Sequence, residues 1–499
     1  MPEAAPFSDI RPAAADPRLS NSALLPTQDR NWSWFDYLSF WMSDVHSVGT
    51  YVTLGNLFAG DLPGIAVAAG LIIGIIIVQM LCNLVAIPSQ QTGTPFPVVC
   101  RASFGVKGAL IPAFVRGVIA ICWYGIQTWL ASNALVVLIL KSAPSFTPWA
   151  DLTQHGLAGL STLGWAAFLA LWLVQAAVFW RGIDAIRHFT EWAGPLIYVV
   201  MLALDLYLLQ RVGFTTGLHS VIDSMTFTAA GSSLHSTIMA ILPTVTLTVS
   251  YFSAPMLNFG DFARYGKSPD AIRHGNFWGL PVNFLAFTAL TLTTIALTVP
   301  AFGIRIADPV ETVARTDNTT VIVIAILAFM IATAGINVVV NFVSASFDFS
   351  NLAPDKISWR AAGLAAAFLS VFMTPWNLYN SPAAMHLTLD FLASLIGPFY
   401  GIIIADYFLI SHRSISVPDL YSFSSKGRYW YKNGVNRPAL LSLGLSALFA
   451  NLTVFLPIFA DFPGISWFVG SLCAMLLYPL LNQKRAATCP AEITMTSQR

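Results

Sequence analysis

Charged residues are scarce in this chain. Asp, Glu, Lys and Arg make up 10% of its 499 residues, and the formal net charge is +1. A protein that binds nucleic acid needs a basic surface to neutralise phosphate groups. The sequence contains no basic stripe of that kind, so we expect no nucleic-acid partner.

Motifs for metal centres and catalysis are missing as well. The five cysteines show no CxxC or Cys/His ligand spacing, which excludes a disulfide framework and a zinc site. Neither HExxH nor GxSxG, two motifs of hydrolytic enzymes, is present. The sequence therefore predicts no catalytic residues, no metal centre and no organic cofactor.

Hydrophobic residues, in contrast, make up 56% of the chain, which is typical of an all-α polytopic membrane protein. A bilayer core about 30 Å thick needs about 20 apolar residues per helix, and the apolar runs predict about twelve transmembrane helices. The predicted spans are 36–58, 63–87, 108–140, 160–180, 188–210, 235–258, 276–302, 319–347, 359–376, 385–410, 437–458 and 463–482. Residues 1–35 lack the pattern of a signal peptide, so we expect a mobile cytoplasmic tail.

Lys and Arg concentrate in alternate loops between these spans, as they do when those loops face the cytoplasm. The loops that we place inside contain Arg101, Lys107, Arg181, Arg187, Arg264, Lys267, Arg273, Lys356, Arg360, Arg413, Lys426, Arg428, Lys432 and Arg437. The loops that we place outside contain Lys141, Arg211, Arg305 and Arg315. This alternation predicts a multi-pass protein of the inner (plasma) membrane with both termini in the cytoplasm.

The first apolar stretch, residues 38–58, carries Asp44, His46, Ser47 and Gly49 near its middle. Ionisable side chains at that depth in a membrane are costly and usually functional. A glycine beside them is typical of a helix that is interrupted where it lines a cavity, which exposes backbone groups to a substrate or an ion. We therefore interpret this span as half of a binding site.

The sixth span contains Pro243 and Pro255, and each proline removes a helical hydrogen bond. We expect this span to be interrupted like the first. Interruptions five helices apart predict two inverted five-helix repeats, 36–211 and 235–410, with a site at their interface. A cytoplasmic loop at 411–436, two further helices within 437–482 and a cytoplasmic tail at 483–499 complete the predicted organisation.

The third span places Trp123 and Gln127 four residues apart, so the two side chains share one helix face. An indole stacks on a flat heterocycle, and a carboxamide offers it both a donor and an acceptor. The eighth span repeats the spacing with Asn337 and Asn341. Packing between helices produces the same pattern, so the functional interpretation depends on agreement among several spans.

Several segments together resemble the nucleobase:cation symporter-1 family, which includes bacterial permeases for hydantoins, allantoin, uracil and cytosine. These segments are NWSWFDYLSFWMSDVHSVGTY, QTGTPFPVVCRASFG, WYGIQT, NFGDFARY, the pair Asn337 and Asn341, GPFYGIIIADYFLI and VPDLY. They occur in order over nearly the whole chain. The resemblance implies a LeuT-like fold, with two inverted five-helix repeats plus two C-terminal helices, and transport by alternating access.

The resemblance also implies a substrate site. Trp123 matches the stacking tryptophan of the family, Gln127 its substrate-binding glutamine and Asn341 its substrate asparagine. Phe252, which follows Tyr251, falls where hydantoin and allantoin carriers have a second tryptophan. A phenyl ring stacks with less area than an indole, so we expect a smaller single-ring substrate.

Two further features bear on the substrate and on the coupling ion. Ser47 falls where those carriers have glutamine or asparagine, which leaves the exact ligand open. Sodium-coupled members supply backbone carbonyls at positions that match Ser43, His46 and Ala332. They add two side-chain hydroxyl groups, and the matching positions in this chain are Gly335 and Ile336. A sodium ion needs several oxygen ligands, so the expected sodium site is incomplete.

Asp44 or His46 could bind a proton instead, because burial favours a neutral carboxylic acid and histidine titrates near neutrality. We therefore predict proton coupling and keep sodium coupling as the alternative. A structural alternative is that Asp44 and His46 pair with neighbouring helices or with each other and hold the broken span rigid.

The prediction is a symporter that imports a planar nucleobase or related lactam ring together with a proton or a sodium ion across the lipid bilayer. A channel and an intramembrane enzyme are weaker alternatives, because selectivity-filter loops and catalytic motifs are missing. We expect structural roles for Arg116, Asp205 and Asp406, since charged groups near membrane ends reach water cheaply. The sequence does not indicate an oligomeric state.

Overall fold

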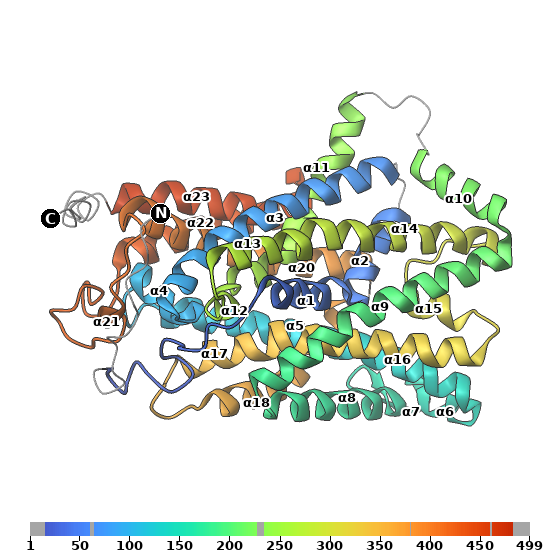
Figure 1. The fold of residues 1–499 in the computed structure, drawn as a ribbon, viewed down its shortest axis with the longest axis horizontal. Helices are drawn as coiled ribbons and strands as arrows, with labels where there is room; N and C mark the ends of the chain where they lie inside the picture. The colour runs from blue at the N-terminus through green and yellow to red at the C-terminus, as the bar shows by residue number, and fades with distance from the viewer. Residues whose placement is uncertain (1–14, 60–63, 227–233, 380, 460–461, 483–499) are drawn as a thin grey trace.

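The computed structural model describes residues 15–59, 64–226, 234–379, 381–459 and 462–482. Long helices run side by side along the longest axis of the molecule (Figure 1). Within the described residues, the sheet content is one hairpin of β1 (Gly156–Leu157) and β2 (Leu160–Ser161). The predicted all-α fold is confirmed. The predicted C-terminal tail, 483–499, lies outside the described residues.

The helices that shape the molecule largely follow the predicted spans. The α-helices are α1 (Trp34–Val45), α2 (Val48–Ala59), α3 (Gly64–Thr92), α4 (Phe96–Phe104), α5 (Leu110–Ser142), α6 (Thr147–Ala150), α7 (Leu152–His155), α8 (Thr162–Trp180), α9 (Ile183–Val212), α10 (Phe214–Thr226), α11 (Leu234–Leu257), α12 (Gly260–Ala263), α13 (Pro269–Phe277), α14 (Asn283–Phe302), α15 (Pro309–Ala314), α16 (Thr319–Ile336), α17 (Ser344–Ser350), α18 (Trp359–Ser370), α19 (Pro375–Leu378), α20 (Pro382–Ala405), α21 (Val417–Leu420), α22 (Arg437–Phe455) and α23 (Ile465–Leu481). Short 3₁₀ turns lie at Pro144–Phe146, Val371–Met373 and Pro457–Phe459.

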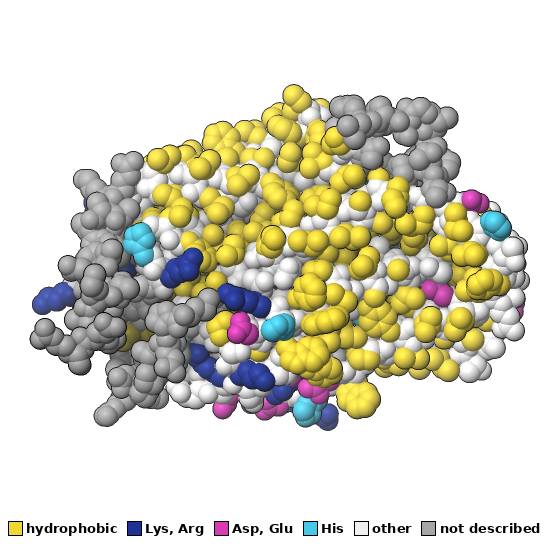
Figure 2. All heavy atoms as spheres, turned by 45° about the horizontal axis from the view of Figure 1, so that its top comes forward, with side chains coloured by type: hydrophobic (Ala, Val, Ile, Leu, Met, Phe, Trp, Pro, Cys, Tyr) yellow, Lys and Arg dark blue, Asp and Glu magenta, His cyan; other side chains and the backbone are white. Residues whose placement is uncertain are grey.

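In the described part of the chain, eight helices are long and apolar enough to cross a membrane. Three shorter apolar helices, Ile241–Leu257, Trp359–Met373 and Ile465–Leu481, and the broken pair α1–α2 occupy the remaining predicted spans. Large apolar side chains such as Leu173, Val199 and Leu476 are exposed on the outer faces of these helices. Figure 2 shows the broad apolar surface that they help to form, as expected for helices that face lipid.

The first span is broken at His46 and Ser47, as predicted. The Ser47 hydroxyl accepts a hydrogen bond from the backbone N–H of Thr50 at 3.1 Å, which caps the start of α2. The backbone N–H of Val48 donates to the Thr333 hydroxyl on α16, also at 3.1 Å. Side chains thus satisfy two of the backbone groups that the break releases.

The sixth span is continuous, so the predicted interruption was wrong. α11 runs through both prolines and ends at Leu257. Close packing against α3 supports it: a Cβ added at Gly70 or Gly74 would lie 2.6 or 2.7 Å from the Cβ atoms of Thr244 and Thr248 on α11. Small residues four apart let two membrane helices approach closely, and a packed neighbour helps a helix to tolerate proline.

Wider π-helical turns occur within three other spans. Trp278–Val282 joins α13 to α14, Asn337–Val343 joins α16 to α17, and Asp406–Ile410 extends α20. Such turns are frequent at functional sites. The second turn contains both asparagines that the sequence singled out.

The described part of the N-terminal segment is packed against the body, so the expected mobility was wrong for these residues. The Leu24 side chain is fully buried. The Arg264 guanidinium donates to the backbone carbonyls of Ala23 and Leu25 at 2.9 and 2.8 Å, and the Tyr421 hydroxyl donates to the carbonyl of Leu24. Residues 1–14 lie outside the described part.

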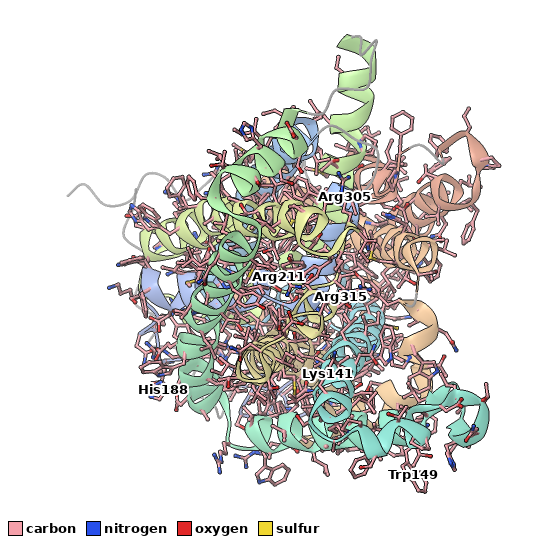
Figure 3. All side chains as sticks on the ribbon, turned by 90° about the vertical axis from the view of Figure 1, so that its right-hand side faces the viewer. Lys141, Trp149, His188, Arg211, Arg305 and Arg315 are labelled. Carbon is pink, nitrogen blue, oxygen red and sulfur yellow. The ribbon has the colours of Figure 1, made fainter. Side chains whose placement is uncertain are left out.

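The cations that we assigned to outside loops share one end of the molecule. Figure 3 looks onto that end and labels Lys141, Arg211, Arg305 and Arg315 on it. On the face shown in Figure 2, the visible Lys and Arg side chains gather toward the opposite end. This distribution agrees with the loop alternation read from the sequence.

Arg116, Asp205 and Asp406 are all buried, although we expected charged groups near membrane ends to reach water. Asp406 accepts a hydrogen bond from the Tyr478 hydroxyl at 2.7 Å, which agrees with a structural role. The Arg116 side chain is fully buried, and within the described residues its guanidinium has no hydrogen-bond partner. Position along a span therefore did not determine exposure.

Candidate functional site

A narrow cavity lies in the interior next to the break in the first span. Its lining side chains come from α1, α5, α11 and the α16–α17 segment. They are Asp44, Trp123, Gln127, Tyr251, Ala254, Pro255, Ile336, Val340 and Asn341. The structure thus brings Trp123, Gln127, Tyr251 and Asn341, four of the six predicted substrate residues, to one cavity.

Trp123 and Gln127 lie on one face of α5, one helical turn apart. The Gln127 carboxamide approaches the start of α2, because a Cβ added at Gly49 would lie 3.0 Å from its Nε2 and 3.1 Å from its Oε1. No hydrogen-bond partner is found for the buried Gln127 Oε1 within the described residues. The glycine therefore makes room for an amide whose oxygen is available to a ligand.

The amide of Asn341 is oriented by a network that begins at Asn337. Asn337 Nδ2, with two hydrogens to donate, lies 3.0 Å from the backbone carbonyl oxygen of Tyr124, 2.9 Å from the Thr128 hydroxyl and 2.7 Å from Gln175 Oε1. A carbonyl can only accept, so this fixes which end of the Asn337 amide is the nitrogen. Its Oδ1 then accepts from Asn341 Nδ2 at 3.0 Å. Asn341 consequently keeps its carbonyl oxygen for the cavity.

Asp44 adds a carboxyl group to the cavity wall. Its side chain is 3% exposed, and Oδ2 is buried without a hydrogen-bond partner in the described structure. No salt bridge to Asp44 is found among the described residues. Together with Gln127 and Asn341, Asp44 gives the cavity three side chains that offer acceptor oxygens.

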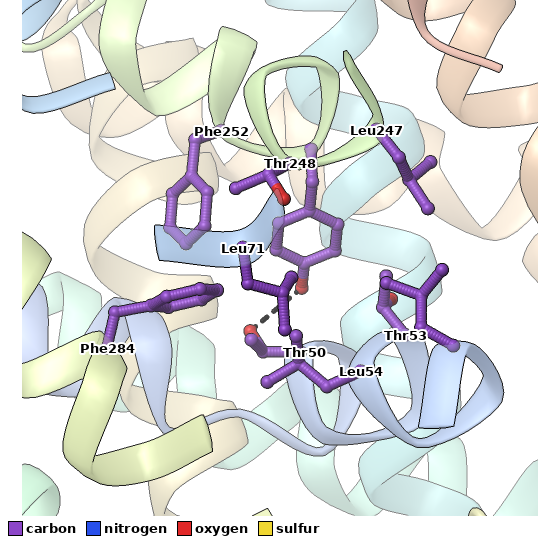
Figure 4. A pocket seen from close by; sticks show the side chains of 10 residues that line it. Thr50, Thr53, Leu54, Leu71, Leu247, Thr248, Phe252 and Phe284 are labelled. Carbon is purple, nitrogen blue, oxygen red and sulfur yellow. Dashed lines mark hydrogen bonds between the residues drawn. The ribbon is translucent and has the colours of Figure 1, made fainter. Parts of the chain in front are cut away.

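Tyr251, and not Phe252, is the ring of α11 that meets Trp123. The Trp123 and Tyr251 ring centroids are 5.6 Å apart at an interplanar angle of 77°, an edge-to-face contact. Phe252 lines a second, more apolar cavity with Phe284 and Leu71, into which Figure 4 looks. The expected arrangement of a ligand between Trp123 and Phe252 is therefore not supported by the geometry.

Ser47 also takes a different place from the one expected. It is not among the described residues that line the cavity. Its hydroxyl caps α2 and lies 3.0 Å from the Thr50 hydroxyl, which in turn lies 3.0 Å from the Tyr251 hydroxyl. Ser47 thus reaches the wall residue Tyr251 indirectly, through the intervening side chain of Thr50.

The predicted coupling-ion positions lie where α1 meets α16. Ala332 is fully buried on α16, and Ile336 faces the substrate cavity. A Cβ added at Gly335 would lie 2.9 Å from the Ser43 hydroxyl oxygen, which is buried without a hydrogen-bond partner in the described residues. A hydroxyl from α1 therefore lies beside Gly335, one of the two positions at which the family resemblance led us to look for a hydroxyl.

The side chain of His46 points away from the substrate cavity. Its Nδ1 lies 2.9 Å from the carbonyl oxygen of Gly194 on α9, so Nδ1 carries the hydrogen in this contact. The imidazole packs on Tyr198 and Phe287, with ring centroids 4.3 and 5.0 Å away. Asp44 and His46 therefore belong to two different environments.

The sequence interpretation missed some contributors to the site. Asn337 orients Asn341, Thr50 bonds to Tyr251, and Ala254 and Val340 complete the wall. The four-residue spacing between Asn337 and Asn341 was a usable signal for the role of Asn337. The small apolar residues carry no such signal, because similar residues line every face of these helices.

Comparison with known proteins agrees with this geometry. The family model described as a permease for cytosine/purines, uracil, thiamine and allantoin matches residues 24–470. The allantoin permease of Bacillus subtilis (strain 168) is 34% identical over 93% of this chain and 93% of its own length. The purine-uracil permease NCS1 of Arabidopsis thaliana is 32% identical over 86% of this chain and 70% of its own length.

Solved structures show the same fold. Mhp1, a nucleobase-cation-symport-1 family transporter in a closed conformation with bromovinylhydantoin bound, superposes with a TM-score of 0.74 at 21% identity, over 95% of this chain and 98% of that chain. A Na⁺-coupled sialic acid symporter superposes with a TM-score of 0.63 at 12% identity, over 93% of each chain. The predicted LeuT-like architecture is confirmed. The chain belongs to the family of permeases for cytosine/purines, uracil, thiamine and allantoin.

Proposed function

We propose that this permease imports a neutral planar ring with several N–H donors, of the lactam type found in hydantoin, allantoin and uracil. The acceptor oxygens that Asp44, Gln127 and Asn341 bring to this cavity carry the proposal. A ring rich in N–H groups satisfies them, whereas a ring without donors leaves them buried and unpaired. Relatives named as allantoin, uracil and hydantoin permeases support this substrate class.

In the proposed complex, Trp123 stacks on one face of the ring and Tyr251 meets its edge or opposite face. Gln127 and Asn341 fix the edge of the ring through hydrogen bonds. Asp44 accepts a further N–H bond and thereby distinguishes ring donors from ring acceptors. No bond in the substrate is made or broken.

The proposed transport cycle moves the repeats 36–211 and 235–410 against each other by alternating access. In this proposal the break at His46 and Ser47 lies at the centre of the movement, next to Asp44 on the cavity wall. We place the protein in the inner (plasma) membrane with both termini cytoplasmic, in agreement with the cations grouped in Figure 3. The cotransported cation is a proton, because Gly335 and Ile336 supply no hydroxyl to a sodium site.

Sodium coupling has one observation in its favour. The unpartnered Ser43 hydroxyl lies beside Gly335 and would replace one missing ligand oxygen. Uptake measured with and without sodium, at fixed pH, separates the two cations. Accumulation that requires sodium would favour this second candidate.

Competition against one labelled substrate tests the substrate class. We expect hydantoin, allantoin and uracil to compete with each other, and ring N-methylation to weaken competition by about 10- to 100-fold for each lost donor. Undiminished competition by fully N-methylated rings would contradict the acceptor-wall proposal. Chemical conversion of the substrate during uptake would instead indicate an enzyme.

A further inference from the structure

A second buried acid, Asp205, lies outside the substrate cavity on α9. Its side chain is 3% exposed, and Oδ2 is buried without a hydrogen-bond partner among the described residues. The residue is seven positions before the end of α9, which corresponds to about 10 Å along the helix from the end that Figure 3 shows. A charge in such a place needs a compensating partner.

The contacts of Thr294 on α14 indicate what that partner is. Its hydroxyl oxygen lies 2.6 Å from Asp205 Oδ1 and 3.0 Å from the backbone carbonyl oxygen of Leu290. A threonine hydroxyl has one hydrogen, and neither an ionised carboxylate nor a carbonyl can donate. The Leu290 carbonyl already accepts a backbone N–H within α14, so the Thr294 hydroxyl can donate to an ionised Asp205. Asp205 Oδ2 would then remain a buried charged oxygen with no donor among the described residues. With a proton on Asp205, the acid can donate to Thr294 while Thr294 donates to Leu290, and no charge stays buried.

Further buried hydroxyls lie on α2 and α14. Tyr51 on α2 lies next to Thr294 and within electrostatic range of Asp205. The Tyr51 hydroxyl interacts with the Thr294 side chain. The hydroxyls of Thr288 and Thr291 are buried and have no hydrogen-bond partner within the described residues. Thr288, Thr291 and Thr294 follow one another at three-residue intervals, so they lie along one side of α14. This environment is polar but provides no positive charge.

The surroundings favour a proton over a metal cation. At this level α9 and α14 are continuous helices, so their backbone carbonyls are engaged within the helices. A sodium ion needs several free oxygens, whereas a proton on a carboxylate needs one acceptor. The titratable and charged groups around Asp205 come from α2, from the outer loop, from α9 itself and from α10. They are Tyr51, Asp308, Tyr207, Arg211, His219 and Asp223.

None of these neighbours supplies the positive charge that an ionised Asp205 would need. Asp308 caps α15 outside the spans, where burial raises the pKa of its carboxyl. Arg211 pairs with Asp317 at 2.6 Å. His219 and Asp223 are exposed. The packed faces of α8, α14 and α16 contain no charged residue.

We propose that Asp205, with the hydroxyls of Thr294 and Tyr51, forms a proton-binding site distinct from the substrate cavity. This inference rests on the proposed proton symport. Tyr51 lies next to Thr50 on α2, and the Thr50 hydroxyl lies 3.0 Å from that of Tyr251 on the cavity wall. The proton site and the substrate site therefore share α2, which provides a physical route for coupling between them.

The test uses the full-length protein purified into nanodiscs and into proteoliposomes, with labelled allantoin as the first probe. Wild-type affinity should increase by about 5-fold or more as the pH falls from about 8 to 5. Asp205→Asn, which resembles the neutral acid, should keep the low-pH affinity at every pH. It should also lose accumulation driven by a pH gradient while retaining exchange of labelled for unlabelled substrate. Asp223→Asn, which changes an exposed acid on α10, should behave like wild type.

The proposal would be overturned if the Asp205→Asn protein kept the wild-type pH dependence of affinity. It would also be overturned if a sodium gradient drove accumulation in wild type and this accumulation were lost in Asp205→Asn. If Asp205→Asn fails to fold, Thr294→Val tests the same site, because loss of its hydrogen bond should displace the midpoint of the pH profile by about half a unit or more. An unchanged midpoint would again overturn the proposal. If no substrate of the panel binds, the proposed function fails instead. The pH dependence of the melting temperature, compared between wild type and Asp205→Asn without substrate, still tests the proton site.

Discussion

Asp44 and Asp205 are two buried membrane acids that look alike when considered alone. Both are 3% exposed, both have an unpartnered Oδ2, and neither forms a salt bridge within the described residues. Their neighbours differ. Asp44 faces rings and amides around a cavity, whereas Asp205 faces hydroxyl groups between packed helices.

This difference shows that burial identifies a costly acid, while the neighbouring groups determine what it can bind. Around Asp44, aromatic faces and amide oxygens match a planar ring with N–H donors. Around Asp205, hydroxyl groups without a compensating positive charge match a neutral, proton-bound acid. The predictions below test whether the two environments separate substrate binding from proton binding.

The largest expected loss of uptake follows from a substitution in the substrate cavity. Gln127→Ala removes an amide that both lines the cavity and fills the space beside Gly49. We expect saturable uptake to fall by about 100-fold or more, because a ring donor and an acceptor lose their partner. Uptake is measured in cells with matched amounts of membrane-inserted protein. Gln154→Ala, at an exposed position on α7, is the control. Normal uptake by Gln127→Ala would show that Gln127 does not bind the substrate.

A smaller loss of affinity is expected for a residue that contacts the cavity wall from behind. Asn337→Ala removes the residue that orients Asn341 without lining the cavity itself. We expect about a 10-fold loss of affinity and weaker discrimination against N-methylated rings, together with a loss of about 1–3 kcal/mol in stability. Binding and thermal unfolding are measured on the same preparation. Unchanged discrimination would show that Asn341 is oriented by another contact.

On the Asp205 side, Tyr51→Phe deletes one buried hydroxyl and keeps the ring. We expect a change of less than about 3-fold in affinity at low pH, and a displaced midpoint in the pH dependence of binding. Competition profiles across the substrate panel should remain those of wild type. A changed ranking of competitors would show that the two environments are not separate.

The smallest effect is expected for Phe252→Leu. This side chain lies in the second cavity shown in Figure 4, so a substitution of similar volume should change affinity by less than about 3-fold. Tyr251→Leu, one residue away, should cost about 10-fold or more because it removes the ring that meets Trp123. Equal losses for the two variants would restore the arrangement in which Phe252 contacts the ligand.

Local spacing in the sequence was sufficient for much of the site. Four-residue intervals placed Trp123 with Gln127 and Asn337 with Asn341, and polar residues marked the break at His46 and Ser47. The same reasoning could have separated Asp44 from His46. Residues two apart on a helix point to different sides, and the structure shows them in different environments.

Other features depended on contacts between distant segments. Proline in α11 suggested a break, but glycines of α3 pack closely against that helix and it remains continuous. Asp205 appeared structural because its environment is created by α2 and α14, which are far from it in sequence. Tyr251, and not Phe252, lines the substrate cavity because of the way α11 is rotated about its axis. The prolines in the sequence of α11 do not specify that rotation.

Substrate affinity measured as a function of pH in wild type, Asp44→Asn and Asp205→Asn tests the central separation most directly. We predict that Asp44→Asn weakens binding at every pH while keeping the wild-type pH dependence, and that Asp205→Asn keeps low-pH affinity while losing that dependence. The reverse assignment, with pH dependence lost in Asp44→Asn and retained in Asp205→Asn, would contradict the account.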